Sequence, residues 1–298
     1  MTVSDTLKNY ADLLEKSLSA YLPPAPEPEN KVREAMAYSL LGGGKRIRGA
    51  LTLAFYELFH DDIRPALSYA AAVEMVHAYS LIHDDLPCMD NSDTRRGKPS
   101  CHVEFGEWTA LLAGDGLLNL AFEVMSNPDY ADGFCKKDVL RAIRCLSLSS
   151  GYSGMIGGQA IDLWQEQNEK EATEEVTLRL ISKKTGALIR ASGEIGCVLG
   201  GADEKAIEAA ISYCEKIGLA FQIRDDILNI IGDSKLQGKP VGSDAKCGKN
   251  TWVSLYGIKA GEEKIAGLNL QAKDALSAFS GDTEFLAGLA DLLADREF

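Results

Sequence analysis

The chain has 298 residues, of which 46% are hydrophobic and 25% charged, and its formal net charge is −13. This composition is typical of a globular protein with a large core. The acidic excess argues against nucleic acid or an anionic membrane surface as the main partner, because both favour cationic proteins. None of the seven cysteines forms a C-x-x-C pair, and we find neither a signal sequence nor an apolar run long enough for a membrane anchor. We therefore expect a cytoplasmic protein with reduced thiols.

Apolar residues recur at helical spacing along almost the whole chain, which predicts an all-α protein. Prolines between residues 23 and 28 and the glycines at 42–44 mark breaks between helices. The expected helices cover residues 4–20, 30–42, 46–60, 64–84, 106–126, 136–150, 156–168, 174–199, 203–232, 250–260, 262–280 and 282–295. We find no strand-like run bounded by hairpin turns and no interdomain linker. Residues 1–298 are therefore expected to form a single domain, a large helical bundle.

Two acidic clusters, at residues 84–90 and 225–229, each follow an apolar helical stretch. A carboxylate at the inner end of an apolar segment costs free energy unless a cation meets it. Two helices that direct such carboxylates into one cavity would suit a divalent cation, which binds one or two carboxylates and completes its shell with substrate phosphates. In the second cluster, Asp225 and Asn229 lie four residues apart and share a helix face. The alternative is that each aspartate pair is a solvated helix end.

The helix before the first cluster has a polar face. At about 100° per residue, His77, Ser80 and Asp84 fall on the same side of it. A regular helix would turn Asp90 away from Asp84, but Pro87 lacks the N–H that a helix needs. We therefore expect the helix to break at Pro87, and the break could bring Asp90 back beside Asp84.

Three basic groups could meet a bound anion. Residues 42–48 combine a glycine turn, the free N–H groups of a helix start and basic side chains. Residues 95–99 follow the first acidic cluster, where arginine can clamp a metal-bound phosphate through two hydrogen bonds. The third group is residues 183–186, with Lys239 and Lys249 beyond the second acidic cluster. Any one group alone would be interpreted as a solvated surface, but three groups around two acidic clusters indicate an anion site.

These motifs carry a family resemblance. In order, LLGGGKRIR, EMVHAYSLIHDDLPCMDNSDTRRGKP, GGQAIDL, KKTGALI, FQIRDDILN and CGKNT lie between about residues 30 and 257. The chain resembles the trans-isoprenyl diphosphate synthases, specifically the bacterial farnesyl diphosphate synthase type. The resemblance implies an all-α homodimer with a deep central cavity in each subunit. It also implies Mg²⁺-dependent head-to-tail condensation of isopentenyl diphosphate with dimethylallyl or geranyl diphosphate, giving (2E,6E)-farnesyl diphosphate.

Matching positions imply roles for individual residues. The resemblance implies three Mg²⁺ ions per subunit, for which Mn²⁺ can substitute. Their implied ligands are Asp84, Asp85, Asp90 and Asp225. The residues implied to contact the allylic diphosphate are Arg95, Lys184, Thr185, Gln222, Lys239 and Lys249. Those implied to bind isopentenyl diphosphate are Lys45, Arg48, His77 and Arg96. The residues expected to support catalysis are Lys184, Thr185, Gln222 and Asp226.

Tyr79 and Ser80 are the expected determinants of product length. Tyr79 precedes Asp84 by five residues, which is about 7–8 Å along a helix axis. A ring at that depth can stop a growing chain, and the small Ser80 leaves room for a ten-carbon substrate. An aromatic residue at the matching position has this role in the enzymes that the sequence resembles. The alternative is that Tyr79 only packs within the bundle.

The sequence departs from the family pattern at two positions. Asn229 stands where the second acidic motif usually has a third aspartate, which puts tight binding of the third metal in question. Gly49 stands where proline commonly follows the first basic motif, which would loosen that helix start.

Other functions remain open. A geranylgeranyl or geranyl diphosphate synthase of the same family is the nearest alternative. Residues 225–233 also have the spacing of a class I terpene cyclase metal motif, although the residues matched to isopentenyl diphosphate favour a two-substrate condensation. A non-catalytic subunit would tend to lose the acids that are kept here. A remote alternative is a di-iron carboxylate bundle, because residues 57–60 and 74–77 both read Glu-x-x-His.

Overall fold

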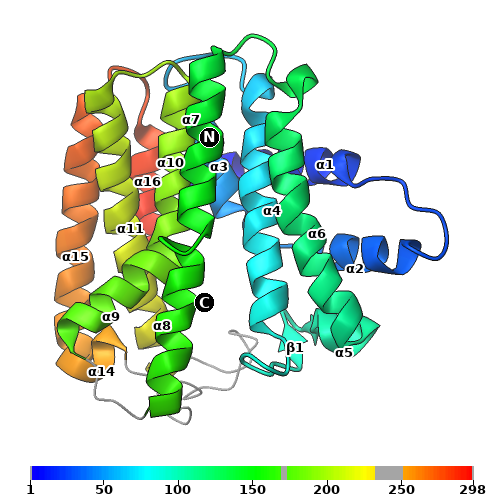
Figure 1. Ribbon diagram of the computed structural model, residues 1–298. Helices are drawn as coiled ribbons and strands as arrows, with labels where there is room; N and C mark the ends of the chain where they lie inside the picture. The colour runs from blue at the N-terminus through cyan, green and yellow to red at the C-terminus, as the bar shows by residue number, and fades with distance from the viewer. Residues whose placement is uncertain (1, 169–172, 232–250, 297–298) are drawn as a thin grey trace.

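The computed structural model describes residues 2–168, 173–231 and 251–296 (Figure 1). Within these ranges the protein is almost entirely helical, which confirms the predicted fold class. The helices are α1 (Val3–Tyr21), α2 (Asn30–Leu40), α3 (Ile47–Glu57), α4 (Leu67–Asp84), α5 (Cys101–Phe105), α6 (Glu107–Ser126), α7 (Lys136–Ser150), α8 (Met155–Asn168), α9 (Glu174–Ile181), α10 (Ala187–Leu199), α11 (Glu204–Ile231), α14 (Trp252–Tyr256), α15 (Ile258–Ala275) and α16 (Glu284–Ala294).

Some helix boundaries differ from the sequence prediction. The helix expected over 174–199 consists of α9 and α10, joined by a π-helical turn at Ser182–Gly186. The helix expected over 250–260 ends at Tyr256, because Gly257 has a φ of +82° and α15 begins directly after it. The short helix α5 was not predicted.

A short hairpin, β1 (Thr94–Arg95) and β2 (Lys98–Pro99), lies where the sequence predicted no strand. Thr94 pairs with Pro99 and Arg95 with Lys98 in antiparallel register. The two loop residues, Arg96 and Gly97, have φ values of +53° and +73°, as a type I′ turn requires. Arginine is an unusual residue for the first loop position, so the turn has little sequence signal. The hairpin fixes two consecutive arginines beside the first acidic cluster.

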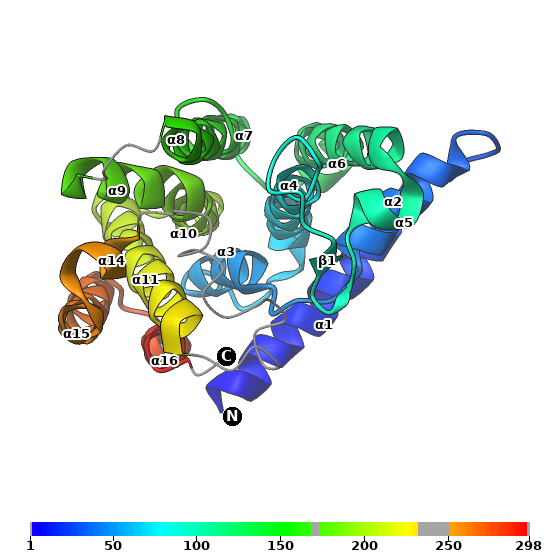
Figure 2. The same cartoon turned by 90° about the horizontal axis from the view of Figure 1, so that it is seen from below.

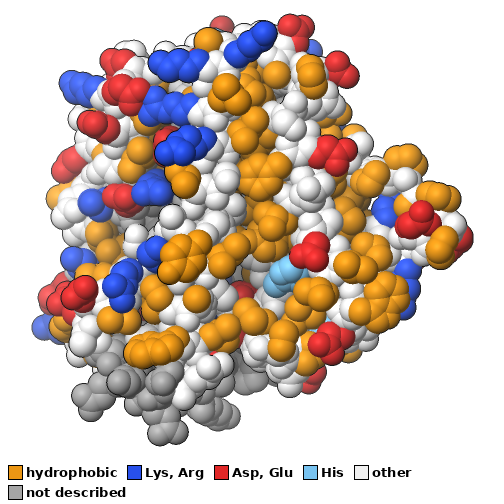
Figure 3. Space-filling model, in the orientation of Figure 1, with side chains coloured by type: hydrophobic (Ala, Val, Ile, Leu, Met, Phe, Trp, Pro, Cys, Tyr) orange, Lys and Arg blue, Asp and Glu red, His pale blue; other side chains and the backbone are white. Residues whose placement is uncertain are grey.

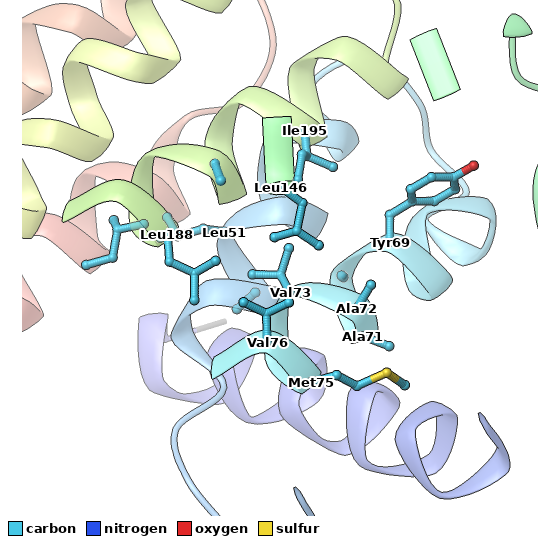
Figure 4. Packing of buried hydrophobic residues seen from close by; sticks show 14 of the residues in the cluster. Leu51, Tyr69, Ala71, Ala72, Val73, Met75, Val76, Leu146, Leu188 and Ile195 are labelled. Atoms are coloured by element: carbon cyan, nitrogen blue, oxygen red, sulfur yellow. The ribbon is translucent and has the colours of Figure 1, made fainter. Parts of the chain in front are cut away.

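Helix α4 lies between α3 and α6 (Figures 1 and 2), and most of its side chains are buried. Figure 4 shows Val73 and Val76 of α4 packed near Leu51 of α3 and Leu188 of α10. Burial of one such side chain contributes about 1.5–3 kcal/mol. Helix α4 is therefore a rigid support for the aspartates at its end. The C-terminal ends of α4 and α11, which carry the two acidic clusters, lie at the same end of the bundle (Figure 1).

Candidate active site

The chain turns back on itself directly after α4. The backbone N–H of Asp90 donates to the carbonyl of Asp84 at 2.9 Å, with Pro87 inside the loop. This closure agrees with the helix break predicted at Pro87. It brings the two carboxylates close enough for the charge of Asp90 to raise the pKa of Asp84. Burial is the larger cause of that raised pKa, and Lys184 opposes both effects.

Asp85 has a different environment from Asp84. Its side chain is buried, and both of its oxygens face Arg95, with Nη2–Oδ1 at 2.5 Å and Nε–Oδ2 at 3.0 Å. Such a two-point contact holds the guanidinium in a fixed plane. Asp85 therefore positions Arg95 beside the acidic cluster, and its predicted role as a metal ligand stays a prediction.

A cavity of about 390 Å³ begins at Asp84 and extends along α4. Its opposite wall is formed by α8 and by the π-helical turn. The residues lining it include the predicted site residues Arg48, His77, Tyr79, Ser80, Asp84, Lys184 and Thr185. Tyr79 is 5% exposed, and its hydroxyl has no hydrogen-bond partner among the described residues. Its ring meets that of His83 edge-on, with centroids 5.7 Å apart.

The π-helical turn presents Lys184 and Thr185 to this cavity. The Nζ of Lys184 donates to Oδ2 of Asp162 at 2.6 Å. Backbone contact with α8 is tight here, since a Cβ on Gly158 would lie 2.3 Å from the Lys184 nitrogen. A π turn is wider than an α turn and often occurs at functional sites. This geometry explains how the end of α9 can deliver two polar side chains into the bundle.

Thr185, Gln222 and Asp226 form a hydrogen-bonded chain. The Thr185 hydroxyl donates to Oε1 of Gln222 at 2.8 Å, and Nε2 of Gln222 donates to Oδ1 of Asp226 at 3.0 Å. These bonds fix the amide of Gln222, so its oxygen dipole has one orientation. The sequence predicted these three residues together with Lys184 as a catalytic group, and hydrogen bonds connect the three in the structure.

A larger cavity of about 1000 Å³ adjoins the first, because Arg48 and His77 line both. Among the other residues that line it are Lys45, Arg95, Arg96 and Asp225. The Nε of Arg48 is buried and lacks a partner among the described residues. A buried donor without an acceptor is costly, so it would be satisfied by an anionic ligand.

The glycine turn and the hairpin meet at the wall of this larger cavity. The guanidinium of Arg96 donates to the carbonyl of Gly43 and lies against Gly44. A Cβ on Gly44 would be 2.9 Å from Nη2 of Arg96, and the φ of Gly44 is +135°. Glycine is thus required at position 44 both for the backbone conformation and for the approach of Arg96.

His77 is surrounded by cationic side chains. Its Nε2 lies 3.4 Å from Nη1 of Arg48. Burial lowers the pKa of His77 well below its usual value, and the charges of Arg48 and Arg96 lower it further. The imidazole is therefore neutral at pH 7 and can donate one hydrogen bond to an anion.

Sequence reasoning missed two arginines at this site. Arg46 is 3% exposed and meets Oε1 of Glu15 at 2.6 Å and Oε2 of Glu74 at 3.4 Å. Arg46 belonged to the basic motif, but nothing in the sequence distinguishes it from Lys45, which is exposed. Arg296, near the C-terminus, contacts Asp225 at 3.3 Å and lies over the ring of Phe221. No motif indicated it.

Two predicted residues, Lys239 and Lys249, lie outside the described residues. Ser80 lines the smaller cavity and its hydroxyl donates to the carbonyl of His77 at 2.8 Å.

The donor set around Asp84 fits a metal that is held jointly with a substrate. In the part of the chain that the structure describes, no three His, Cys, Asp or Glu side chains are grouped closely enough to hold a metal. Burial and the charge of Asp90 nevertheless raise the pKa of Asp84, so the ionised form of Asp84 lacks full compensation from the described cations. A hard divalent cation supplies that compensation when diphosphate oxygens and water complete its shell.

The di-iron alternative is wrong. His60 is exposed and stacks on Tyr56, with ring centroids 4.7 Å apart. Glu57 accepts from the hydroxyl of Tyr10, and Glu74 is occupied by Arg46. The two Glu-x-x-His motifs therefore do not share a site.

Residues 29–278 match the family model described as polyprenyl synthetase. The chain belongs to the polyprenyl synthetase family. It is 41% identical to farnesyl diphosphate synthase of Escherichia coli (strain K12), over 94% of each chain. It is also 41% identical to the heterodimeric geranylgeranyl pyrophosphate synthase large subunit 1 of Arabidopsis thaliana, over 96% of this chain and 77% of the relative. Its structure matches that of an FPP/GFPP synthase from Zymomonas mobilis with a TM-score of 0.88, at 35% identity over 98% of each chain.

The family defines the reaction class. The protein is a prenyltransferase, a short-chain trans-isoprenyl diphosphate synthase that depends on a divalent metal and uses isopentenyl and allylic diphosphates. The predicted family and enzyme class are thereby confirmed. None of the helices in the described ranges has the length and apolar character needed to cross a membrane.

Proposed function

We propose that the protein condenses isopentenyl diphosphate head to tail with dimethylallyl and then geranyl diphosphate, and that (2E,6E)-farnesyl diphosphate is its main product. The observation that carries this proposal is the position of Tyr79. Its ring lines the same cavity as Asp84. Tyr79 precedes Asp84 by five residues on α4, about one and a half turns deeper in the bundle, and is almost fully buried. A growing chain that starts at the acidic end would meet this ring after a limited number of isoprene units.

In this proposal, the allylic diphosphate binds at the acidic end of the smaller cavity. Three Mg²⁺ ions, or Mn²⁺ in their place, would be held by Asp84, Asp90 and Asp225 with Asp85 nearby, and would neutralise the diphosphate so that it leaves readily. Arg95 and Lys184 donate to its oxygens, and Lys239 and Lys249 are assigned to the same diphosphate from the sequence. No nucleophilic side chain is required.

The carbocation formed by ionisation would be stabilised by fixed dipoles. The hydrogen-bonded chain of Thr185, Gln222 and Asp226 holds the amide oxygen of Gln222 in place before the reaction starts. Preorganised dipoles stabilise developing charge without the cost of reorienting solvent. Attack by the double bond of isopentenyl diphosphate forms the new carbon–carbon bond, and the departing diphosphate accepts the proton that is lost.

Isopentenyl diphosphate is assigned to the larger cavity. Lys45, Arg48, Arg96 and neutral His77 line it, and the unpartnered Nε of Arg48 gives its diphosphate a buried donor. Because Arg48 and His77 line both cavities, the two substrates would lie next to each other.

Geranylgeranyl diphosphate is the second candidate product. The geranylgeranyl pyrophosphate synthase relative is as similar in sequence as the farnesyl diphosphate synthase relative. Met75 and Val76, one turn deeper on α4, are fully buried in the core and would form the next floor if Tyr79 did not stop the chain (Figure 4).

We further propose that the protein is a homodimer. Large apolar side chains are exposed along α6 and α7 and just beyond α7, including Trp108 (60%), Leu140 (67%) and Tyr152 (83%). Figure 3 shows hydrophobic side chains spread over this face. Extended apolar surface of this kind usually marks a protein interface. The cytoplasmic location and the single domain over residues 1–298 stay predictions.

The product assignment is tested by chromatography. The purified protein is incubated with Mg²⁺, isopentenyl diphosphate and dimethylallyl, geranyl or farnesyl diphosphate in turn. A fifteen-carbon main product from the first two, with little extension of the third, supports the proposal. A main product of twenty carbons would contradict it.

A further inference from the structure

A third cavity, of about 510 Å³, lies among α9, α10, α11 and α15. It shares a wall with the active site, because consecutive residues of the π-helical turn divide between the two. Lys184 and Thr185 line the active-site cavity, whereas Ser182 and Lys183 line this one. No described residue lines both. The cavity is therefore separate from the sites assigned to the two substrates.

The charged side chains that line this third cavity are mostly cationic, although the protein as a whole is acidic. Lys183, Arg190, Lys216 and Lys264 come from the π-helical turn and three different helices, and Glu215 is the single acidic residue among the described lining residues. The net charge of the whole chain is −13. The lining of this cavity, with four cations and one acid, is therefore positively charged although the whole chain is negatively charged. A positive local charge favours an anionic ligand.

These cations are not neutralised by the described part of the protein. Lys216 and Lys264 form no ion pair with any described residue, and Lys183 donates only to the carbonyl of Ser153, at 2.7 Å. The Nε of Arg190 is buried and has no acceptor among the described residues. A buried guanidinium N–H without an acceptor is unfavourable, and a phosphate oxygen would satisfy it.

The rest of the lining is apolar. Leu178 and Ile181 of α9, Leu219 of α11 and Leu268 of α15 contribute side chains to it. The volume falls within the range of ordinary small-molecule sites. A simple inorganic anion would leave this apolar wall in contact with water, whereas a ligand with a short hydrocarbon chain would cover it.

We propose that this cavity is an additional ligand site that binds a phosphate-bearing amphiphile. The anionic head group lies at Arg190, Lys216 and Lys264, and the hydrocarbon chain lies against Leu219 and Leu268. The proposal does not depend on the product assignment, because it concerns residues outside the active-site cavities.

The test measures binding of n-decyl phosphate to the full chain by calorimetry in the presence of EDTA. The charge-reversed variant Lys216→Glu/Lys264→Glu should bind at least about tenfold more weakly than the wild type, since two charge-assisted contacts are lost. The control is Lys259→Glu, on the same helix as Lys264 with a side chain 91% exposed, and it should bind as the wild type does. Lys183 is left unchanged because it neighbours Lys184. The basal prenyltransfer activity of all three proteins should be equal, which also verifies folding.

A further variant separates binding in the proposed cavity from binding at the active site. Lys45→Ala/Arg96→Ala should retain binding of n-decyl phosphate to the third cavity. Equal affinity of Lys216→Glu/Lys264→Glu and the wild type, or loss of binding in Lys45→Ala/Arg96→Ala alone, would overturn the proposal. If the double variant does not fold, Lys264→Glu alone replaces it, because this lysine is exposed. A smaller decrease in affinity is then expected, since one charge-assisted contact is lost instead of two, and an affinity equal to that of the wild type would again overturn the proposal.

Three further ligands define the recognised chemistry. Inorganic phosphate and n-decanol should each bind at least about tenfold more weakly than n-decyl phosphate, because each lacks one half of the amphiphile. Equal binding of inorganic phosphate would contradict the role of the apolar wall. Geranyl diphosphate distinguishes two possible sources of the natural ligand. If geranyl diphosphate binds more tightly than n-decyl phosphate, the natural ligand belongs to the isoprenyl diphosphates that the enzyme itself uses or makes. If it binds more weakly, the natural ligand is another lipid phosphate.

Discussion

The backbone N–H of Gly49, in the first turn of α3, donates to Oε1 of Glu74, in the middle of α4, at 2.9 Å. Proline, which is common at this position in the family that the sequence resembles, has no N–H to donate. The other oxygen of Glu74 lies 3.4 Å from Arg46, which also meets Glu15. The departure at Gly49 therefore does not leave this helix start loose. It adds a hydrogen bond to a buried network that holds the start of α3, and with it Arg48, against α4.

Glu74→Gln should lower the free energy of unfolding by about 1–3 kcal/mol, because buried Arg46 loses one of its two carboxylate partners. Urea denaturation measures this change. The control is Glu208→Gln, an exposed position on α11, which should leave the unfolding midpoint unchanged. If both variants unfolded at the same urea concentration as the wild type, the Glu74–Arg46 contact would contribute nothing to stability.

Asp84→Asn should reduce kcat by about 100-fold or more while leaving stability unchanged or slightly higher. The loss of activity follows from the removal of a charge that would bind the metal–diphosphate complex. The retained stability follows from the raised pKa of Asp84, which shows that burial disfavours its ionised form. Steady-state kinetics and thermal melting separate the two effects, with Asp12→Asn, at an exposed position on α1, as the control. Near-wild-type turnover in folded Asp84→Asn would refute the metal assignment.

Arg96→Ala should raise the KM for isopentenyl diphosphate by about tenfold and change the KM for the allylic substrate much less. Arg96 lies against the glycine turn at the larger cavity and does not line the smaller one. Loss of one charge-assisted contact to a diphosphate corresponds to about that factor. Initial rates with each substrate varied in turn provide the measurement. A rise in the allylic KM alone would show that the two diphosphate sites have been exchanged.

His77 should make the folded protein sensitive to mild acid. Burial and the nearby arginines lower its pKa in the folded state, so the unfolded chain binds a proton at a higher pH than the folded protein does. The associated stability is present above about pH 6.5 and is lost as the pH falls below that value. The urea midpoint of the wild type should therefore fall more between pH 7.5 and pH 5.5 than that of His77→Gln. The raised pKa of Asp84 acts in the opposite direction in both proteins, so it cancels in the comparison. Equal midpoint changes would contradict a depressed His77 pKa.

The parts of this fold that could be predicted depend on local sequence signals. Helical periodicity gave the fold class, and Pro87 gave the turn that brings Asp90 back to Asp84. The parts that could not be predicted depend on contacts between distant segments. Arg46 is buried only because Glu15 and Glu74 meet it, and Arg96 adopts a positive φ in a hairpin whose sequence is untypical. Arg296 reaches Asp225 from the far end of the chain, where no motif marks it.

The role of Tyr79 in limiting product length is tested most directly by the products of three proteins: the wild type, Tyr79→Ala and Tyr79→Phe. Each is incubated with Mg²⁺, isopentenyl diphosphate and dimethylallyl diphosphate, and the chain lengths are determined by chromatography. Tyr79→Phe keeps the ring and removes a hydroxyl that has no partner among the described residues, so it should make the same fifteen-carbon product as the wild type. Tyr79→Ala opens the cavity towards Met75 and should shift the main product to twenty carbons or more. An unchanged product length in Tyr79→Ala, or a wild type that already makes mainly twenty-carbon product, would contradict this role of Tyr79.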